Sequence, residues 1–84
     1  MSIENINVET LGKDQVVVTN GNEQIFTSYG SKIAKIEGTK VTIGRDFEYS
    51  RTTQKYLKQF LGVPIATTRK NIKSGLWEFD ENLH

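Results

Sequence analysis

The spacing of the apolar residues changes near residue 50, and this change limits the folds that the chain can adopt. Before it, short apolar stretches rich in β-branched residues, such as residues 15–19, lie between turn-forming pairs, which is typical of short strands. After it, Tyr56, Leu57 and Phe60 recur at the spacing of one side of a helix. Strands followed by helices predict an α+β domain.

Turn signals divide the first half of the chain into four or five short strands, between about residues 3 and 47. Asn20-Gly21 is the strongest of these signals, because an Asn-Gly pair favours a tight hairpin in which both residues take positive φ. Glu37-Gly38 predicts a second tight turn, and Gly30-Ser31 predicts a bulge or a bend. We therefore expect an antiparallel β-meander.

The first of two short helices is predicted at about residues 51–61. Ser50 is suited to cap its start, because the serine hydroxyl can accept a hydrogen bond from a free amide of the first turn. Gly62 is suited to end it in the left-handed conformation. The apolar side of this helix, which includes Thr53, is expected to cover the apolar face of the meander.

The second helix is predicted at about residues 67–74, after an extended connector at residues 63–65 that contains Pro64. Thr67 would cap this helix, and the segment at residues 76–79 would form a final anchoring strand or coil. Together these elements predict a single two-layer domain over residues 1–84.

Size and composition restrict where such a chain works. With 84 residues the chain fits one small domain, and it contains no cysteine. Small secreted domains usually need disulfides, so the absence of cysteine favours a cytoplasmic protein. No N-terminal apolar stretch resembles a signal peptide, and no apolar run is long enough to cross a membrane. We expect no membrane partner.

The distribution of charge is more informative than the net charge of +1. Residues 51–77 hold six basic residues and no acidic residue. On helix 51–61, three of them fall within about 60° of each other, opposite the apolar side. Such a surface suits a phosphate backbone or an acidic protein. Tyrosines and Trp77 nearby could offer stacking faces to single strands. A basic helix face that is simply solvated is an equally simple interpretation. The predicted nucleic-acid-binding residues are Arg51, Lys55, Lys58, Arg69, Lys70 and Lys73.

Groups that carry catalysis are scarce in the sequence. The one histidine is His84, the last residue, and chain ends are poor places for a general base. Asp46 and Glu48 would share a face if they lay in a strand, but nothing near them completes a metal or acid–base site. No phosphate-binding glycine loop is present. We expect no enzyme, no catalytic residue, no cofactor and no metal.

Residues 56–72 superficially resemble a helix-turn-helix, with Gly62 as the turn glycine. Lys58 then falls where a small residue should pack between the helices, and Thr68 and Asn71 fall where the second helix should be apolar. The match is therefore only partial.

Several segments between residues 25 and 76 resemble a family of small uncharacterised proteins from phages and prophages of Gram-positive bacteria. The most specific of them is Tyr-Ser-x-Thr-Thr at residues 49–53; its structural interpretation is that Tyr49 staples onto the first helical turn, Ser50 caps it and Thr53 packs inward. The other segments are Phe26-Thr27-Ser28-Tyr29, Ile33-Ala34, Lys40-Val41-Thr42-Ile43-Gly44, Gln54-Lys55-Tyr56-Leu57, Phe60-Leu61-Gly62 and Ile72-Lys73-Ser74-Gly75.

The resemblance implies a phage accessory protein in the host cytoplasm, and it brings no catalytic residue with it. We therefore predict a non-catalytic binding protein that associates with nucleic acid through the basic helical face. The alternative is an inhibitor of a host defence or nucleic-acid enzyme, of the anti-CRISPR or anti-restriction type, that acts by binding a host protein. A free edge strand would also allow a homodimer.

Overall fold

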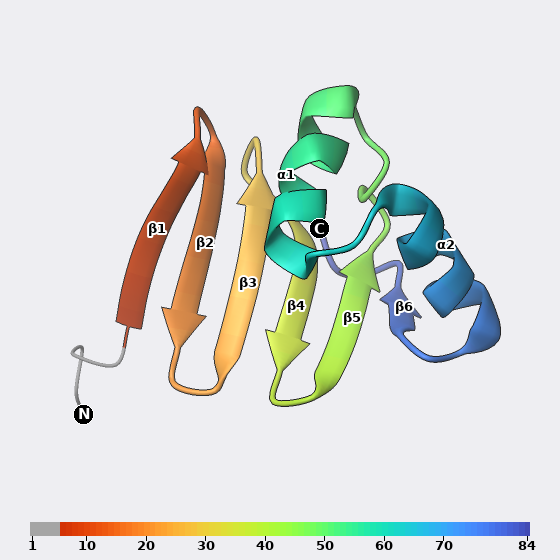
Figure 1. Ribbon diagram of the computed structural model, residues 1–84. Helices are drawn as coiled ribbons and strands as arrows, with labels where there is room; N and C mark the ends of the chain where they lie inside the picture. Colours follow the sequence, from red (N-terminus) through yellow and green to blue (C-terminus); the bar gives the residue numbers. More distant parts are fainter. Residues whose placement is uncertain (1–5) are drawn as a thin grey trace.

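A computed structural model describes residues 6–84 and confirms the α+β fold (Figure 1). The predicted start of the strands at about residue 3 lies outside the described residues. Consecutive antiparallel strands form the expected meander, and two helices follow it. The elements are β1 (Ile6–Gly12), β2 (Gln15–Asn20), β3 (Glu23–Ser28), β4 (Ser31–Glu37), β5 (Lys40–Gly44), α1 (Arg51–Leu61) and α2 (Ile65–Ser74).

A sixth strand, β6 (Glu78–Asp80), completes the sheet beside β5. The sheet order is β1-β2-β3-β4-β5-β6, and β6 runs parallel to β5. A parallel neighbour requires a crossover connection, which α1 and α2 provide here. The last segment is thus a strand, and the sheet is a five-stranded meander with one parallel strand added at its edge.

Two of the predicted hairpin turns lie one residue further along the chain. Asn20 is the last residue of β2 and pairs with Glu23, so the loop is Gly21-Asn22, with φ of 60° at Gly21. The expectation that Asn20 takes positive φ is therefore wrong. The second turn is shifted in the same way, to Gly38-Thr39, with φ of 60° at Gly38. In both turns glycine occupies the first central position, where positive φ costs it nothing.

The hairpin between β3 and β4 also differs from the expectation. Its loop is Tyr29-Gly30, and both residues have positive φ, 52° and 82°. Of the bulge or bend predicted at Gly30-Ser31, the bend is present as this turn, whereas the bulge lies further along β4, at Ile33, because the pairing steps from Phe26–Ala34 to Thr27–Lys32. The Tyr29 amide donates to the carbonyl of Asp14 over 2.8 Å, which links this turn to the turn between β1 and β2.

Local signals set the bounds of α1 as predicted. The Ser50 hydroxyl accepts a hydrogen bond from the Thr53 amide, and Gly62 ends the helix with φ of 77°. In contrast, α2 begins at Ile65 and not at 67. The Pro64 carbonyl accepts hydrogen bonds from the amides of Thr67 and Thr68, so the helix starts directly after proline and Thr67 is not its cap.

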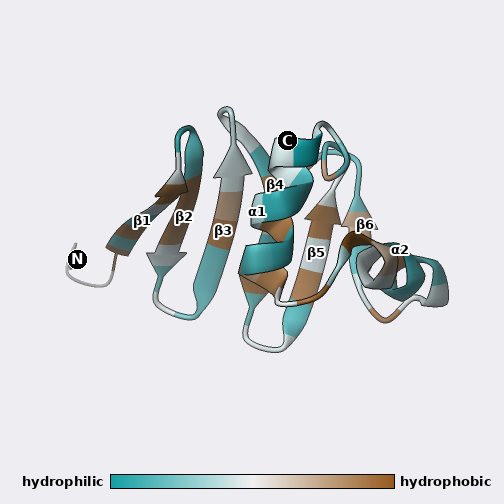
Figure 2. Ribbon diagram, turned by 45° about the horizontal axis from the view of Figure 1, so that its top comes forward, coloured by the Kyte–Doolittle hydropathy of each residue, from teal (hydrophilic) through white to brown (hydrophobic). Residues whose placement is uncertain are grey.

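The core lies between one face of the sheet and the helices. The register places Val17, Phe26, Ala34 and Ile43 side by side across four strands, and all are buried. Leu57 of α1 packs against this row, as Figure 2 shows by the band of hydrophobic residues under α1. Figures 1 and 2 show α1 over the middle of the sheet and α2 beside β6. Among residues 6–84, no helix is long and apolar enough to cross a membrane.

Candidate functional site: a basic helical surface

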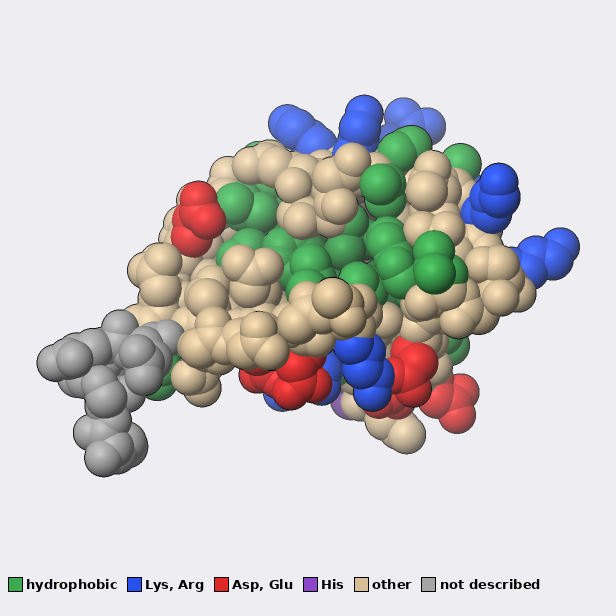
Figure 3. Space-filling view, turned by 60° about the horizontal axis from the view of Figure 1, so that its bottom comes forward, with side chains coloured by type: hydrophobic (Ala, Val, Ile, Leu, Met, Phe, Trp, Pro, Cys, Tyr) green, Lys and Arg blue, Asp and Glu red, His purple; other side chains and the backbone are tan. Residues whose placement is uncertain are grey.

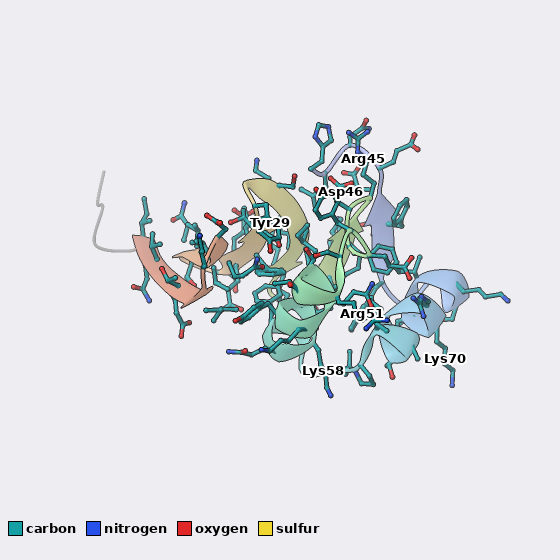
Figure 4. The ribbon with its side chains drawn as sticks, turned by 90° about the horizontal axis from the view of Figure 1, so that it is seen from above. Tyr29, Arg45, Asp46, Arg51, Lys58 and Lys70 are labelled. Atoms are coloured by element: carbon teal, nitrogen blue, oxygen red, sulfur yellow. The ribbon has the colours of Figure 1, made fainter. Side chains whose placement is uncertain are left out.

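The outer side of α1 carries the predicted basic residues of the first helix. Arg51, Lys55 and Lys58 are all exposed, whereas Thr53 and Leu57 on the opposite side are buried. Figure 4 shows Lys58 pointing away from the sheet, with Arg51 on the side of α1 that faces α2. The amphipathic spacing of the sequence therefore places these charges in solvent, as expected.

The basic residues of α2 are exposed as well, but one of them is engaged. Arg69 forms an ion pair with Glu48, whose Oε2 accepts from Nε and lies against Nη2. The sequence pattern placed no acid near Arg69, because Glu48 precedes the basic stretch and reaches α2 only through the fold. The other five have no ion-pair partner among residues 6–84 and are called the helical basic surface: Arg51, Lys55, Lys58, Lys70 and Lys73.

Charge is divided unevenly between the two layers. The helical layer, residues 51–74, holds no acidic side chain, and Figure 3 shows Lys and Arg side chains projecting along its margin. Among residues 6–84 the acidic side chains belong to the sheet, its turns, the β5–α1 turn and the C-terminal segment, and most of those seen in Figure 3 lie at the opposite margin. One of them, Glu78, lies 2.8 Å from Lys40. This contact, first through the hydrogen bond and then through the charge of Glu78, raises the pKa of Lys40.

The tyrosines and the tryptophan are mostly engaged elsewhere. Tyr56 is half-buried beneath the ammonium of Lys55, which lies 5.3 Å from its ring centroid. Trp77 is also half-buried and packs against the core. Tyr29 and Tyr49 are exposed, but their rings pair with each other at a centroid distance of 6.3 Å. Tyr56 therefore lies beside the helical basic surface but is partly covered by Lys55, whereas Tyr29 and Tyr49 pair with each other outside the two helices.

The Tyr-Ser-x-Thr-Thr segment has a structural role in the fold. Ser50 caps α1, and the fully buried Thr53 hydroxyl lies 2.9 Å from the hydroxyl of Ser28 on β3. This contact fastens the first turn of α1 to the sheet. Tyr49 is 71% exposed and pairs with Tyr29, so it does not act as the predicted staple.

The candidate acid–base residues do not form a site together. Asp46 and Glu48 lie in the turn between β5 and α1, not in a strand, because β5 ends at Gly44. Glu48 pairs with Arg69, while Asp46 lines a small hollow of about 120 Å³ beside Tyr29. Residues 6–84 contain no group of three side chains that could hold a metal ion. His84 is exposed.

The helix-turn-helix pattern remains incomplete in three dimensions. Residues 62–64 join α1 and α2, a connection of suitable length. Lys58, however, is exposed, although a helix-turn-helix would pack a small residue there. Thr68 is the buried residue of α2, and its hydroxyl donates to the Pro64 carbonyl at 3.5 Å.

Sequence reasoning missed an apolar hollow between α2 and β6, with a volume of about 250 Å³. It is lined by the apolar side chains Phe47, Ile72 and Phe79 and by the basic side chains Arg69 and Lys73. The alternation of Phe79 with Glu78 and Asp80 was the available signal, because it gives β6 one apolar face. A second hollow, of about 270 Å³, lies between α1 and strands β1 to β3.

The chain belongs to a family of unknown function, DUF8033, whose model matches residues 1–78. The prediction that the chain belongs to an uncharacterised family is thus confirmed, and the match covers more of the chain than the segments between residues 25 and 76. Neither a curated protein nor a solved structure gives a significant match to the chain.

Proposed function

We propose that this member of DUF8033 is a non-catalytic protein that associates with nucleic acid, and that the helical basic surface contacts the phosphate backbone. One observation carries the proposal. The helical layer presents five basic side chains that lack an ion-pair partner among the described residues, and its own sequence holds no acid. A polyanion would neutralise these charges and release its own counterions, which is the main source of non-specific affinity for nucleic acid.

The stability of the helices does not account for this charge pattern. Neither α1 nor α2 has an acidic residue in its first turn, although a carboxylate there would stabilise a helix by roughly 0.3–1 kcal/mol. Lys55 also follows Arg51 by four residues, a like-charge spacing that costs a few tenths of a kcal/mol. A helical surface that lacks the stabilising carboxylates and includes a repulsive pair of like charges fits a role in binding an anionic partner.

Salt-dependent binding provides the test. Fluorescence anisotropy of a labelled 20-mer, as a single strand and as a duplex, would be titrated with protein at salt concentrations from 25 to 200 mM. If all five side chains contact duplex phosphates, the slope of log K against log salt should approach about −4.5, from roughly −0.9 per contact. The double variant Lys58→Ala with Lys70→Ala should make that slope less steep by about 1.8.

A matched control removes the same charge from the sheet side. The double variant Lys13→Ala with Lys32→Ala changes the net charge equally, and both lysines are exposed in the sheet layer. This control should leave the slope unchanged. The proposal fails if the protein does not bind either oligonucleotide at 25 mM salt, or if the two double variants weaken binding equally.

The edge strand β1 favours a second candidate, an inhibitor of a host defence or nucleic-acid enzyme. Within the described part of the chain, one side of β1 has no neighbouring strand, and its Ile6 and Val8 side chains are 47% and 60% exposed. A partner protein could add a strand at such an edge, and so could a second copy of this chain. Both candidate functions fit a phage-encoded protein in the cytoplasm of its host, the setting that the resemblance implies.

Capture from nuclease-treated host lysate tests this second candidate. One stoichiometric host protein should be retained, and Val8→Lys should abolish its capture by placing a charge at the edge. Leu76→Lys is the control, because Leu76 is 69% exposed and lies outside β1. Equal capture by both variants, or no host partner at all, would exclude strand addition at β1. A concentration-dependent dimer in sedimentation that Val8→Lys disrupts would instead identify the second copy as the partner.

A further inference from the structure

The hollow between α2 and β6 exposes an aromatic ring that the fold leaves uncovered. Phe79 is 48% exposed, whereas Phe47 beneath it is only 9% exposed. Their rings meet edge to face, with centroids 6.3 Å apart and an interplanar angle of 73°. The buried ring contacts the exposed one, and the rest of the Phe79 ring presents an apolar surface to solvent.

The register of β6 explains why this surface is apolar. Phe79 pairs with the buried Ile43 of β5 and therefore lies on the helix-covered face of the sheet. Glu78 and Asp80 alternate with it and point to the other face, where Glu78 pairs with Lys40. The acidic residues that flank Phe79 in sequence are thus kept away from the hollow.

Two of the side chains that line the hollow are cationic. Arg69 and Lys73 of α2 line it together with Ile72, and α2 contains no acidic residue. Glu48 engages Arg69 in an ion pair, while Lys73 has no such partner among the described residues. A free positive charge beside an exposed aromatic ring matches a ligand that combines a flat apolar ring with a nearby anion.

We propose that this hollow binds an unpaired base of single-stranded nucleic acid, with the base against Phe79 and a neighbouring phosphate on Lys73. Aromatic side chains beside a basic groove are the usual means of holding single strands. Bases inside a duplex are already stacked and do not present their faces. The hollow is also smaller than the roughly 300 Å³ or more of typical small-molecule sites, which favours a single ring.

This inference rests on the proposed function, because the helical basic surface would hold the rest of the strand. It adds a preference for unpaired bases that phosphate contacts alone do not produce. An acidic peptide with an aromatic anchor is the competing occupant. The test therefore includes a duplex, a base-free phosphate backbone and such a peptide.

The experiment measures binding of Phe79→Leu to a 12-nucleotide oligothymidylate and to a 12-base-pair duplex at 50 mM salt. Leucine keeps this part of the hollow apolar but removes the aromatic ring. We expect single-strand binding to weaken about 5- to 150-fold, equivalent to about 1–3 kcal/mol per stacked base, while duplex binding stays unchanged. The salt slope should not change, because no charge is removed. Phe79→Trp should retain single-strand binding, which a merely structural role of the ring would not predict.

Tyr49→Leu is the matched control, because it removes an exposed aromatic ring that lies outside the hollow. It should leave single-strand binding unchanged. Trp77, the one tryptophan of the chain, lies two residues before Phe79, so its fluorescence should change on addition of the oligothymidylate. An oligomer of abasic phosphate units should bind more weakly than the oligothymidylate and should not respond to Phe79→Leu.

Three results would overturn the inference. They are equal binding of the abasic oligomer and the oligothymidylate, an equal loss of duplex and single-strand binding in Phe79→Leu, and tighter binding of an acidic pentapeptide with a central tryptophan. If wild-type protein binds both oligonucleotides and Lys58→Ala with Lys70→Ala reduces the slope, but Phe79→Leu has no effect, only the base site is wrong. If the wild-type protein binds no oligonucleotide, the proposed function fails as well.

Discussion

Replacing Thr53 with valine should destabilise the domain far more than the loss of one surface hydroxyl would. The Thr53 side chain is fully buried, and its hydroxyl lies 2.9 Å from that of Ser28, which is itself only 2% exposed. The Ser50 hydroxyl also donates to Thr53 Oγ1, at 3.1 Å. Valine keeps the shape of threonine, so the change isolates the hydrogen bonds from the packing.

The magnitude follows from which groups lose their partners. In Thr53→Val the Ser28 hydroxyl stays buried and loses its one side-chain partner, which costs about 1–3 kcal/mol. Ser50 is only half-buried, and it still accepts from the amide of residue 53. In Ser28→Ala, Thr53 keeps its contact with Ser50, so the loss should be nearer 0.5–1.5 kcal/mol. The double variant should cost less than the sum, because no orphaned serine hydroxyl remains.

Urea denaturation followed by circular dichroism provides the assay. With a slope of about 1 kcal/mol/M for a small domain, Thr53→Val should lower the midpoint by about 1–3 M. The coupling energy from the double-mutant cycle should be at least about 0.5 kcal/mol. Thr52→Val is the control, since Thr52 is exposed and the same change there should stay within about 0.5 kcal/mol.

Additive effects of the two single variants would refute the argument. So would a midpoint for Thr53→Val that equals the midpoint of Thr52→Val. In either case the short distance between the two hydroxyls would carry no energy, and the attachment of α1 to β3 would rest on apolar contacts alone.

Three further changes test the core and the charges. Leu57→Ala should lower the free energy of unfolding by about 2–5 kcal/mol and leave little folded protein at 37 °C, because Leu57 is only 1% exposed. The control Leu76→Ala, at a position that is 69% exposed, should leave the thermal unfolding temperature nearly unchanged. Gln15→Met should raise the urea midpoint, because the buried Gln15 amide finds no hydrogen-bond partner among the described residues; an unchanged or lower midpoint would contradict this. Glu78 raises the pKa of Lys40, so the stabilisation from this ion pair is present at neutral pH and is lost as pH rises through the raised pKa. Lys40→Gln should therefore flatten the dependence of folding stability on pH above about pH 10. An unaltered dependence would show that the ion pair does not contribute to stability.

Sequence reasoning succeeded where the signal lies within a few residues of the feature. Ser50 and Gly62 define both ends of α1, because a cap and a left-handed glycine act on the adjacent turn. The alternation of residues in the first half predicted the strands and their antiparallel order. Sequence reasoning misplaced two hairpin turns by one residue and the start of α2 by two. In these places a neighbouring glycine or proline fits the requirements of the turn or of the helix start equally well.

The basic residues were also evident from the sequence, since a helical repeat places Arg51, Lys55 and Lys58 on one side whatever the helix packs against. The side chains that surround the basic residues in the folded protein were not evident from the sequence. Glu48 precedes Arg69 by 21 residues, and only the docking of α2 beside the β5–α1 turn brings the two together. The sequence therefore overstated by one the number of free positive charges.

The strand β6 and the hollow beside it were decided by the tertiary structure alone. A strand of three residues has too few positions for its residue pattern to predict that it pairs in parallel with β5. Its position in the sheet also depends on the length of the two helices before it. Phe47, Ile72 and Phe79 come from a turn, a helix and a strand, and no local rule relates them. The amino-acid sequence by itself determined the five strands of the meander, the two helices and the charge on their surfaces. The pairing of residues far apart in the chain depends on how all the elements pack at once, so it required the folded structure.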